Sequence, residues 1–182
     1  MDFLWRSNSH FNLANLFTMV NITAGLLATY CITQNHFTYA ILLAWIGGAF
    51  DIFDGKIARK YGLSNEFGVQ LDSFADFLSF VLVPTFLIFQ AIYSTLEGAA
   101  LIAVAIGSIY YVISGLRRLI QFNINADVGE VAKYFTGVPT PLGAILLWLT
   151  YLAAPWITWM GVLALMIFIG ASLNSKVKIP HP

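Results

Sequence analysis

Four aspartates occupy a short stretch of the chain, and their spacing indicates that they act together. Asp51 and Asp54 are three residues apart, and Asp72 and Asp76 are four residues apart. On α-helices these spacings place the two members of each pair on one face. If the two helices form an antiparallel hairpin, all four carboxylates point toward one another. Repulsion and desolvation would prevent four such groups from all staying ionised unaided.

A hard divalent cation would resolve this conflict, because carboxylate oxygens are ligands that Mg²⁺, Mn²⁺ and Ca²⁺ prefer. We therefore expect the four aspartates to bind one such ion or a pair of such ions. Three bases lie close by in the sequence, Lys56, Arg59 and Lys60. A hard-metal site beside a basic cluster is suited to phosphate oxygens.

Small residues flank the aspartates. Gly55 and Ala58 follow the first pair, and Gly68 extends the face of the second pair by one helical turn. Small residues let helix backbones approach closely inside membranes. We expect the two aspartate-bearing helices to pack against each other at these three positions.

The composition excludes most water-soluble classes. Of the 182 residues, 59% are hydrophobic and only 10% are charged, whereas soluble domains average about 25% charged. Nine bases balance nine acids, so the chain lacks the basic excess of a nucleic-acid binder. A single cysteine, Cys31, excludes an internal disulfide framework. This composition is typical of an integral membrane protein.

Apolar segments predict an all-α integral membrane protein with one domain over residues 1–182. The six expected transmembrane helices cover residues 13–32, 37 to about 61, 73–96, 98–116, 141–154 and 156–173. Roughly 20 apolar residues span a bilayer. The second segment reaches that length only if its helix continues through Asp51 and Asp54. Pro155 is expected to separate the last two helices.

The bases predict the orientation of these helices. In the six-helix arrangement all nine Lys and Arg residues fall on the side of the N-terminus, which the positive-inside rule assigns to the cytoplasm. Both termini and the aspartates are therefore expected on the cytoplasmic side of a multi-pass cell-membrane protein. Residues 3–6 are expected to form a short interfacial segment on that surface.

The aspartate motif resembles the signature of the CDP-alcohol phosphotransferases. It runs Asp51-Ile-Phe-Asp54-Gly55-Lys-Ile-Ala58-Arg59, then eight residues, then Gly68-Val-Gln-Leu-Asp72-Ser-Phe-Ala-Asp76, with all eight defining positions present. The resemblance covers essentially the whole chain. It implies a six-helix homodimer with a cytoplasm-facing active site that acts on a CDP-linked lipid.

The resemblance also implies roles for individual residues. Asp51, Asp54 and Asp72 would bind the divalent metal that holds the lipid pyrophosphate. Asp76 would act as the general base and share a second metal ion. The residues expected to contact the CDP-lipid are Asn15, Thr18, Gly55, Ala58, Arg59 and Gly68.

Three flanking segments resemble the phosphatidylserine synthase branch of that family. They are residues 15–21, where Ala14 precedes in place of the usual Pro, residues 115–123, where Gln121 replaces a common Arg, and residues 135–141. Together they imply transfer of the phosphatidyl group from CDP-diacylglycerol, or a CDP-ether lipid, to the hydroxyl of L-serine, with release of CMP. Asn15, Thr18 and Asn21 share one face of the first helix, either toward the nucleotide or in interhelical hydrogen bonds.

Serine carries a carboxylate, which the planar guanidinium of arginine binds through both oxygens. Arg117 and Arg118 are expected to end the fourth helix. One of them, with Lys133 and Thr136 on the following loop, is expected to form the wall that binds serine and phosphate. Alternatively, these cations only set the topology and contact lipid headgroups.

Two other functions fit the same residues. A phosphorylated acceptor, such as glycerol 3-phosphate or inositol phosphate, would need further cations in the acceptor pocket, and the chain has few. A cation-coupled transporter could use the same aspartates, but it would be favoured by internal repeats or broken helices, and the sequence shows neither. The expected partners are thus a CDP-lipid, L-serine, membrane lipids and a second copy of the chain, with no nucleic acid.

Overall fold

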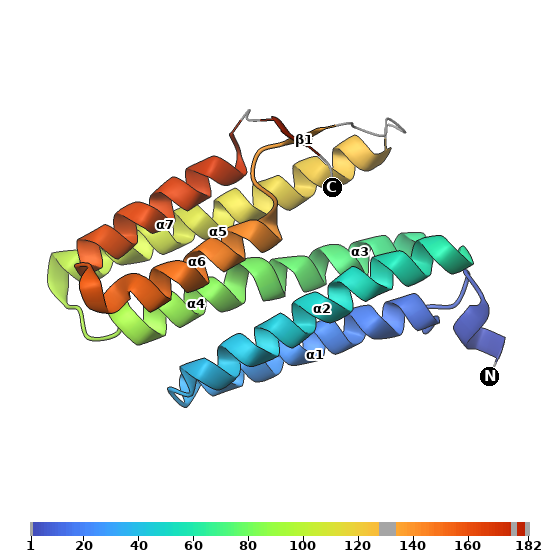
Figure 1. The fold of residues 1–182 in the computed structure, drawn as a ribbon, viewed down its shortest axis with the longest axis horizontal. Coiled ribbons are helices and arrows are strands. Elements are labelled where there is room, and N and C mark those ends of the chain that lie inside the picture. The colour runs from blue at the N-terminus through green and yellow to red at the C-terminus, as the bar shows by residue number, and fades with distance from the viewer. Residues whose placement is uncertain (1, 128–133, 176–177, 181–182) are drawn as a thin grey trace. The chain divides into compact units, whose positions relative to one another are not determined.

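Helices make up nearly all of the regular structure. The computed structural model describes residues 2–127, 134–175 and 178–180. The elements in chain order are the 3₁₀ helix η1 (Asp2–Trp5), α1 (Leu13–Thr33), α2 (Phe37–Tyr61), α3 (Glu66–Asp76), the π-helical η2 (Phe77–Leu82), α4 (Val83–Ile88), the π-helical η3 (Phe89–Tyr93), α5 (Gly98–Asp127), strand β1 (Tyr134–Thr136), α6 (Thr140–Ala153), the 3₁₀ helix η4 (Ala154–Trp156), α7 (Trp159–Leu173) and strand β2 (Lys178–Pro180) (Figure 1). The chain divides into two compact units, Met1–Ser79 and Phe80–Pro182.

Four helical stretches are long and apolar enough to cross a bilayer, which confirms the expected all-α membrane class. They are Leu13–Thr33, Phe37–Tyr61, Glu66–Tyr93 and Gly98–Ile124. The apolar helices Thr140–Trp156 and Trp159–Leu173 are shorter than the roughly 20 residues that a perpendicular span requires. Six spans and the orientation of the termini therefore stay predictions.

The helix boundaries agree with the sequence except in the third and fourth helices, since the third helical stretch is Glu66–Tyr93 and not 73–96. α2 continues through Asp51 and Asp54 to Tyr61, and Pro155 lies in η4 between α6 and α7. The prediction that the fourth helix ends at Arg117 and Arg118 is wrong, because α5 continues to Asp127. No Gly or Pro follows the arginine pair within the helix, and two adjacent charges are not themselves a helix stop signal.

In the first unit, α1 packs against both α2 and α3. Figure 1 shows α1 and α2 side by side along most of their length. Both helices carry buried alanines, namely Ala24 and Ala28 on α1 and Ala40 and Ala44 on α2. Such small side chains allow the close backbone approach that holds helices together in lipid. Gly62 caps the C-terminal end of α2, and its left-handed conformation (φ 63°) suits glycine.

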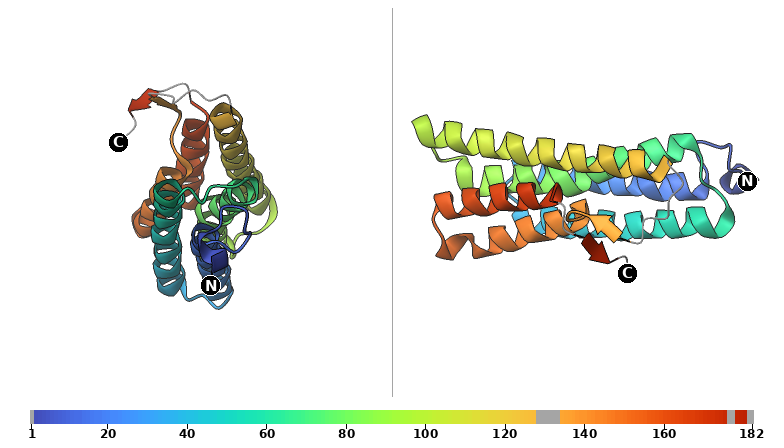
Figure 2. Two further views of the ribbon diagram at one scale, coloured as in Figure 1. Left: turned by 90° about the vertical axis from the view of Figure 1, so that its right-hand side faces the viewer. Right: turned by 90° about the horizontal axis from the view of Figure 1, so that it is seen from above.

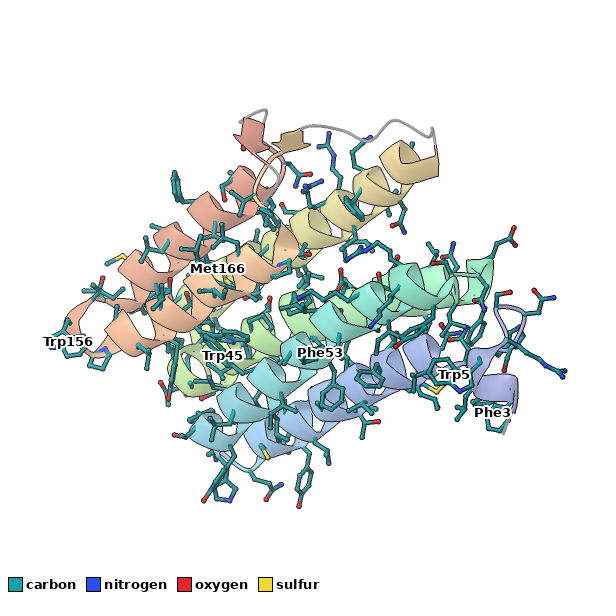
Figure 3. The ribbon with its side chains drawn as sticks, turned by 45° about the vertical axis from the view of Figure 1, so that its right-hand side comes forward. Phe3, Trp5, Trp45, Phe53, Trp156 and Met166 are labelled. Atoms are coloured by element: carbon teal, nitrogen blue, oxygen red, sulfur yellow. The ribbon has the colours of Figure 1, made fainter. Side chains whose placement is uncertain are left out.

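Large apolar side chains project outward from the helices. Trp45 and Phe53 on α2 are exposed (Figure 3), as are Leu26 and Tyr30 on α1. In water such a surface would aggregate, whereas lipid tails are as apolar as these side chains. The exposure therefore agrees with the membrane class.

The second unit has its own apolar core. α7 packs against α5 and α6, and Figure 2 shows α6 and α7 side by side. Val104, Tyr111, Leu147 and Met166 are completely buried in this unit. At its end β1 and β2 form a short antiparallel pair, with Tyr134 opposite Pro180.

The side chain of Asn65 links the N-terminal segment to the start of α3. Asn65 accepts a hydrogen bond from the Gly68 backbone N–H through Oδ1 at 2.6 Å. Its Nδ2 donates to the carbonyl oxygens of Ser7 and Ser9. Asn65 is thus both the N-cap of α3 and the link between α3 and the segment that precedes α1.

The substitution Asn65→Ala should therefore destabilise the first unit. Loss of the cap alone costs about 1–2 kcal/mol, which lowers the melting temperature of a chain of this size by about 2–8 °C. Thermal unfolding in detergent micelles measures the change. Asn8→Ala, at an exposed position of the same N-terminal segment, is the matched control, and equal melting temperatures for the two variants would contradict the assigned role of Asn65.

Candidate functional site

Three of the four aspartates converge as the sequence predicts. One carboxylate oxygen from each of Asp51, Asp72 and Asp76 lies within 4.8 Å of the other two. Asp51 comes from α2, and the other two come from α3, so the convergence joins two elements of the first unit. Three carboxylates at this separation repel one another strongly in an apolar environment.

Asp54 faces α1. It is 5% exposed, and its Oδ2 accepts a hydrogen bond of 2.6 Å from the hydroxyl of Thr18. The Thr18 hydroxyl also lies 3.3 Å from the carbonyl oxygen of Ala14, one turn earlier. Thr18, which was expected to contact the CDP-lipid, thus holds the carboxylate of Asp54 in this structure.

Asn21 lies one turn further along the same face of α1 and contacts Asp51. Its Nδ2 donates to Asp51 Oδ1 at 3.0 Å, and its Oδ1 accepts from the hydroxyl of Ser79 at 2.7 Å. The sequence predicts that the face shared by Asn15, Thr18 and Asn21 points either toward the nucleotide or into interhelical hydrogen bonds, and the contacts of Asn21 are of the second kind. The sequence does not point to Ser79. The regular spacing of polar residues along α1 is the feature of the sequence from which a contact between Asn21 and the aspartates could be predicted.

Asn15 of α1 lies against the first turn of α3. Its Nδ2 donates to the carbonyl oxygen of His10 at 3.1 Å. A Cβ at Gly68 would lie only 2.5 Å from Asn15 Oδ1. Position 68 therefore has no room for a larger side chain, because α1 approaches α3 there.

The expectation that small residues bring the two aspartate-bearing helices together is thus wrong for Gly68. Gly55 does not support it either, since a Cβ there would meet only the Arg59 guanidinium, at 3.7 Å or beyond. Close approaches instead involve α1. A Cβ at Gly47 of α2 would lie 2.7 Å from Asn21 Oδ1. The physical reason is that α1 lies against both neighbours and has polar side chains at the contacts.

The carboxylates differ in the partners that the protein provides. Asp51 and Asp54 each accept a hydrogen bond from α1. The Oδ1 atom of Asp76 is buried, and none of the described residues gives it a hydrogen bond. A buried acceptor without a donor, beside two further carboxylates, fits a hard cation well. The donor set consists only of oxygens, as Mg²⁺, Mn²⁺ and Ca²⁺ prefer.

In the second unit the two neighbouring arginines have different environments. Arg118 is 6% exposed, and its Nε donates to the carbonyl oxygen of Val138 at 3.3 Å. Arg117 is exposed. The structure thus connects Arg118 to the segment that precedes α6. Of the other two residues expected in the acceptor wall, Lys133 lies outside the described residues and Thr136 belongs to β1.

Comparison with known proteins agrees with the motif. The family model described as CDP-alcohol phosphatidyltransferase matches residues 11–171. The chain belongs to the CDP-alcohol phosphatidyltransferase family. The match extends over residues of both compact units, from α1 to α7.

Several relatives of this CDP-alcohol phosphatidyltransferase have names that specify the acceptor. The CDP-diacylglycerol–serine O-phosphatidyltransferase of Bacillus subtilis is 31% identical over 91% of this chain and 88% of its own length. The protein of the same name from Methanocaldococcus jannaschii is 36% identical over 74% of this chain and 58% of its own length. The archaetidylserine synthase of Methanothermobacter thermautotrophicus is 29% identical, over 93% of this chain and 70% of its own length.

The two glycines of the family motif should respond differently to alanine. Gly68→Ala should destabilise this CDP-alcohol phosphatidyltransferase by about 1–3 kcal/mol, because the new Cβ collides with the buried amide of Asn15. Gly55→Ala is the matched control. Its Cβ meets only ordinary contacts, and Ala in a helix interior is favoured over Gly by about 0.5–1 kcal/mol. Thermal unfolding of metal-free protein compares them, and a loss for Gly55→Ala as large as that for Gly68→Ala would contradict the packing described above.

Proposed function

We propose that this protein transfers the phosphatidyl group of CDP-diacylglycerol, or the equivalent group of a CDP-ether lipid, to the hydroxyl of L-serine and releases CMP. The observation that carries the proposal is the convergence of Asp51, Asp72 and Asp76, together with the buried Oδ1 of Asp76, which has no donor among the described residues. Membership of the family supports the reaction class. The names of the relatives support serine as the acceptor and leave both kinds of lipid open.

Asp51, Asp54, Asp72 and Asp76 are proposed to hold divalent metal, either Mg²⁺ or Mn²⁺, with Ca²⁺ as a further candidate and two ions as the expected number. When bound, such ions neutralise the pyrophosphate and stabilise the charge that develops on the departing CMP. The chain contributes the positions of the ligands. Asn21 and Thr18 of α1 hold the carboxylates of Asp51 and Asp54.

Asp76 is proposed to accept the proton of the serine hydroxyl as that oxygen attacks the lipid-bearing phosphorus. A general base has to reach the hydroxyl within hydrogen-bond distance. The Oδ1 atom of Asp76 is not engaged by any hydrogen-bond donor among the described residues, so it is available to accept a proton. Direct displacement requires no nucleophilic side chain.

The nucleotide is proposed to lie beside Gly55, Ala58 and Arg59 on α2. The space next to Gly55 is bordered by the Arg59 guanidinium, which is exposed and suited to phosphate oxygens. Thr18 is proposed to contribute to CDP-lipid binding indirectly, by holding the carboxylate of Asp54. The contacts of Asn15 and Gly68 support an indirect role for both, in which they set the packing of α1 against α3.

Arg118 is proposed to bind the serine carboxylate. Its guanidinium is buried and fixed through Nε by the Val138 carbonyl, and a fixed guanidinium binds a carboxylate with less loss of side-chain freedom. Arg117 is exposed and is assigned to the lipid headgroup region. Lys133 and Thr136 complete the proposed wall.

We further propose a single domain over residues 1–182 in the cell membrane, with six spans, cytoplasmic termini, an interfacial segment at residues 3–6 and a cytoplasm-facing site. The distribution of bases supports this orientation. Phe3 and Trp5 are exposed on η1 (Figure 3), and Trp5 lies edge-on against Tyr61 at 5.1 Å, which supports the interfacial segment. A homodimer is proposed from the family resemblance alone.

Release of CMP from CDP-diacylglycerol by the purified full chain tests the reaction. We expect release that requires Mg²⁺ or Mn²⁺, stops with EDTA and occurs with L-serine but not with glycerol 3-phosphate or inositol phosphate. Asp76→Asn should abolish turnover and retain CDP-lipid binding, because it keeps the shape of the side chain and removes the base. If CMP were released only with a phosphorylated acceptor, that acceptor would replace serine in the proposed reaction. No release with any alcohol would refute the enzyme reaction and favour the transporter.

Serine kinetics test the assignment of the two arginines. Arg118→Ala should raise the KM for serine about 10- to 100-fold, the loss expected for one hydrogen-bonded charged partner, while the KM for CDP-lipid changes little. Arg118→Lys should be intermediate, since lysine keeps the charge without the planar geometry. Arg117→Ala is the control and should stay within about twofold. A larger effect from Arg117→Ala than from Arg118→Ala would reverse the assignment.

A further inference from the structure

A chain of two hydrogen bonds leads from Ser79 to the metal-site carboxylate of Asp51. The Ser79 hydroxyl contacts Asn21 Oδ1 at 2.7 Å, and Asn21 Nδ2 contacts Asp51 Oδ1 at 3.0 Å. Asn21 and Ser79 are 0% and 1% exposed. Neither side chain belongs to the aspartate motif, and neither one is needed as a metal ligand or as a base in the proposed reaction.

The direction of both hydrogen bonds follows from chemistry. An ionised carboxylate only accepts hydrogen bonds, so the NH₂ group of Asn21 has to face Asp51. The carbonyl oxygen of the same amide then faces Ser79, whose hydroxyl has to donate. Without this donor the amide oxygen of Asn21 would be buried and unsatisfied, and the orientation that favours Asp51 would no longer be fixed.

Two glycines leave the space that this arrangement needs. A Cβ at Gly25, one turn beyond Asn21 on α1, would lie 3.0 Å from the Ser79 hydroxyl. A Cβ at Gly47, one turn before Asp51 on α2, would lie 2.7 Å from Asn21 Oδ1. The amide is thus confined on the side of α2, and the hydroxyl is confined on the side of α1.

We propose that Ser79 is a positioning residue for the metal site: it fixes the amide of Asn21, which in turn holds the carboxylate of Asp51 in the orientation that binds the cation. This inference rests on the proposed function, because Asp51 has to be a metal ligand. Hydrogen-bond partners of metal ligands orient them, and losing one such partner weakens metal affinity or activity by 10- to 100-fold in known metal sites.

Binding of Mn²⁺ alone, without lipid or serine, tests the proposal in the full chain in detergent micelles. Free Mn²⁺ is measured by its electron paramagnetic resonance signal. We expect Ser79→Ala and Asn21→Ala each to raise the Kd for Mn²⁺ about tenfold, and the double variant to be no weaker than Asn21→Ala. Non-additivity of this kind shows that Ser79 acts through Asn21. Ser79→Cys, which keeps a weak donor, should recover part of the affinity.

Ser108→Ala is the matched control, because Ser108 is also a buried helical serine and its hydroxyl lies 3.9 Å from Met166 Sδ. It should bind Mn²⁺ like the unmodified protein. In kinetics, Ser79→Ala should raise the Mn²⁺ concentration needed for half-maximal CMP release and leave kcat at saturating Mn²⁺ nearly unchanged. A merely structural defect would instead lower kcat at every Mn²⁺ concentration.

The outcomes separate this inference from the proposed function. An unchanged Kd for Ser79→Ala, or multiplied losses in the double variant, would overturn the positioning role while Asp51→Asn still loses Mn²⁺ binding. An unchanged Kd for Asp51→Asn would overturn the metal role of Asp51 in the proposed function and the role of Ser79 with it.

Discussion

A carboxylate buried among apolar helices needs either a hydrogen-bond donor or a cation, and this requirement organises the first unit. α1 supplies the donors, with Thr18 on Asp54 and Asn21 on Asp51. Because these bonds are short, α1 has to approach its neighbours closely, and glycines at the contacts make that approach possible. The first helix carries no charge, yet its side chains hold both aspartates of α2.

The same requirement distinguishes the aspartates from one another. Asp51 and Asp54 are held by protein donors, whereas the buried Oδ1 of Asp76 has none among the described residues. A carboxylate oxygen that the protein does not satisfy is one that a ligand, a cation or a substrate proton can satisfy. The free Oδ1 of Asp76 thus supports its proposed role as the base, whereas Asp72 is assigned to the metal because it lies beside Asp51 and Asp76.

The sequence predicts the helices and the aspartate convergence because both depend on periodicity along one chain. The spacing of Asp72 and Asp76 determines a shared face, and the apolar runs determine where helices lie. Packing partners depend on all neighbouring helices at once, so Gly68 was paired with α2 although it meets Asn15 of α1. Arg117 and Arg118 could not be separated either, because adjacent residues differ by about 100° around a helix and only the packed unit shows that Arg118 faces inward.

The π-helical segment η2, which begins directly after Asp76 and contains Ser79, affects how this part of the chain tolerates a change of length. A π turn closes its hydrogen bonds over one more residue than an α turn. A one-residue deletion between 77 and 82 that converts the segment to an ordinary α-helix would therefore leave the flanking helical faces in nearly the same relative orientation. A one-residue deletion within the regular helix α3 would instead rotate all following residues by about 100° relative to those before it. Changes of length should consequently disturb the neighbouring faces less in η2 than in α3.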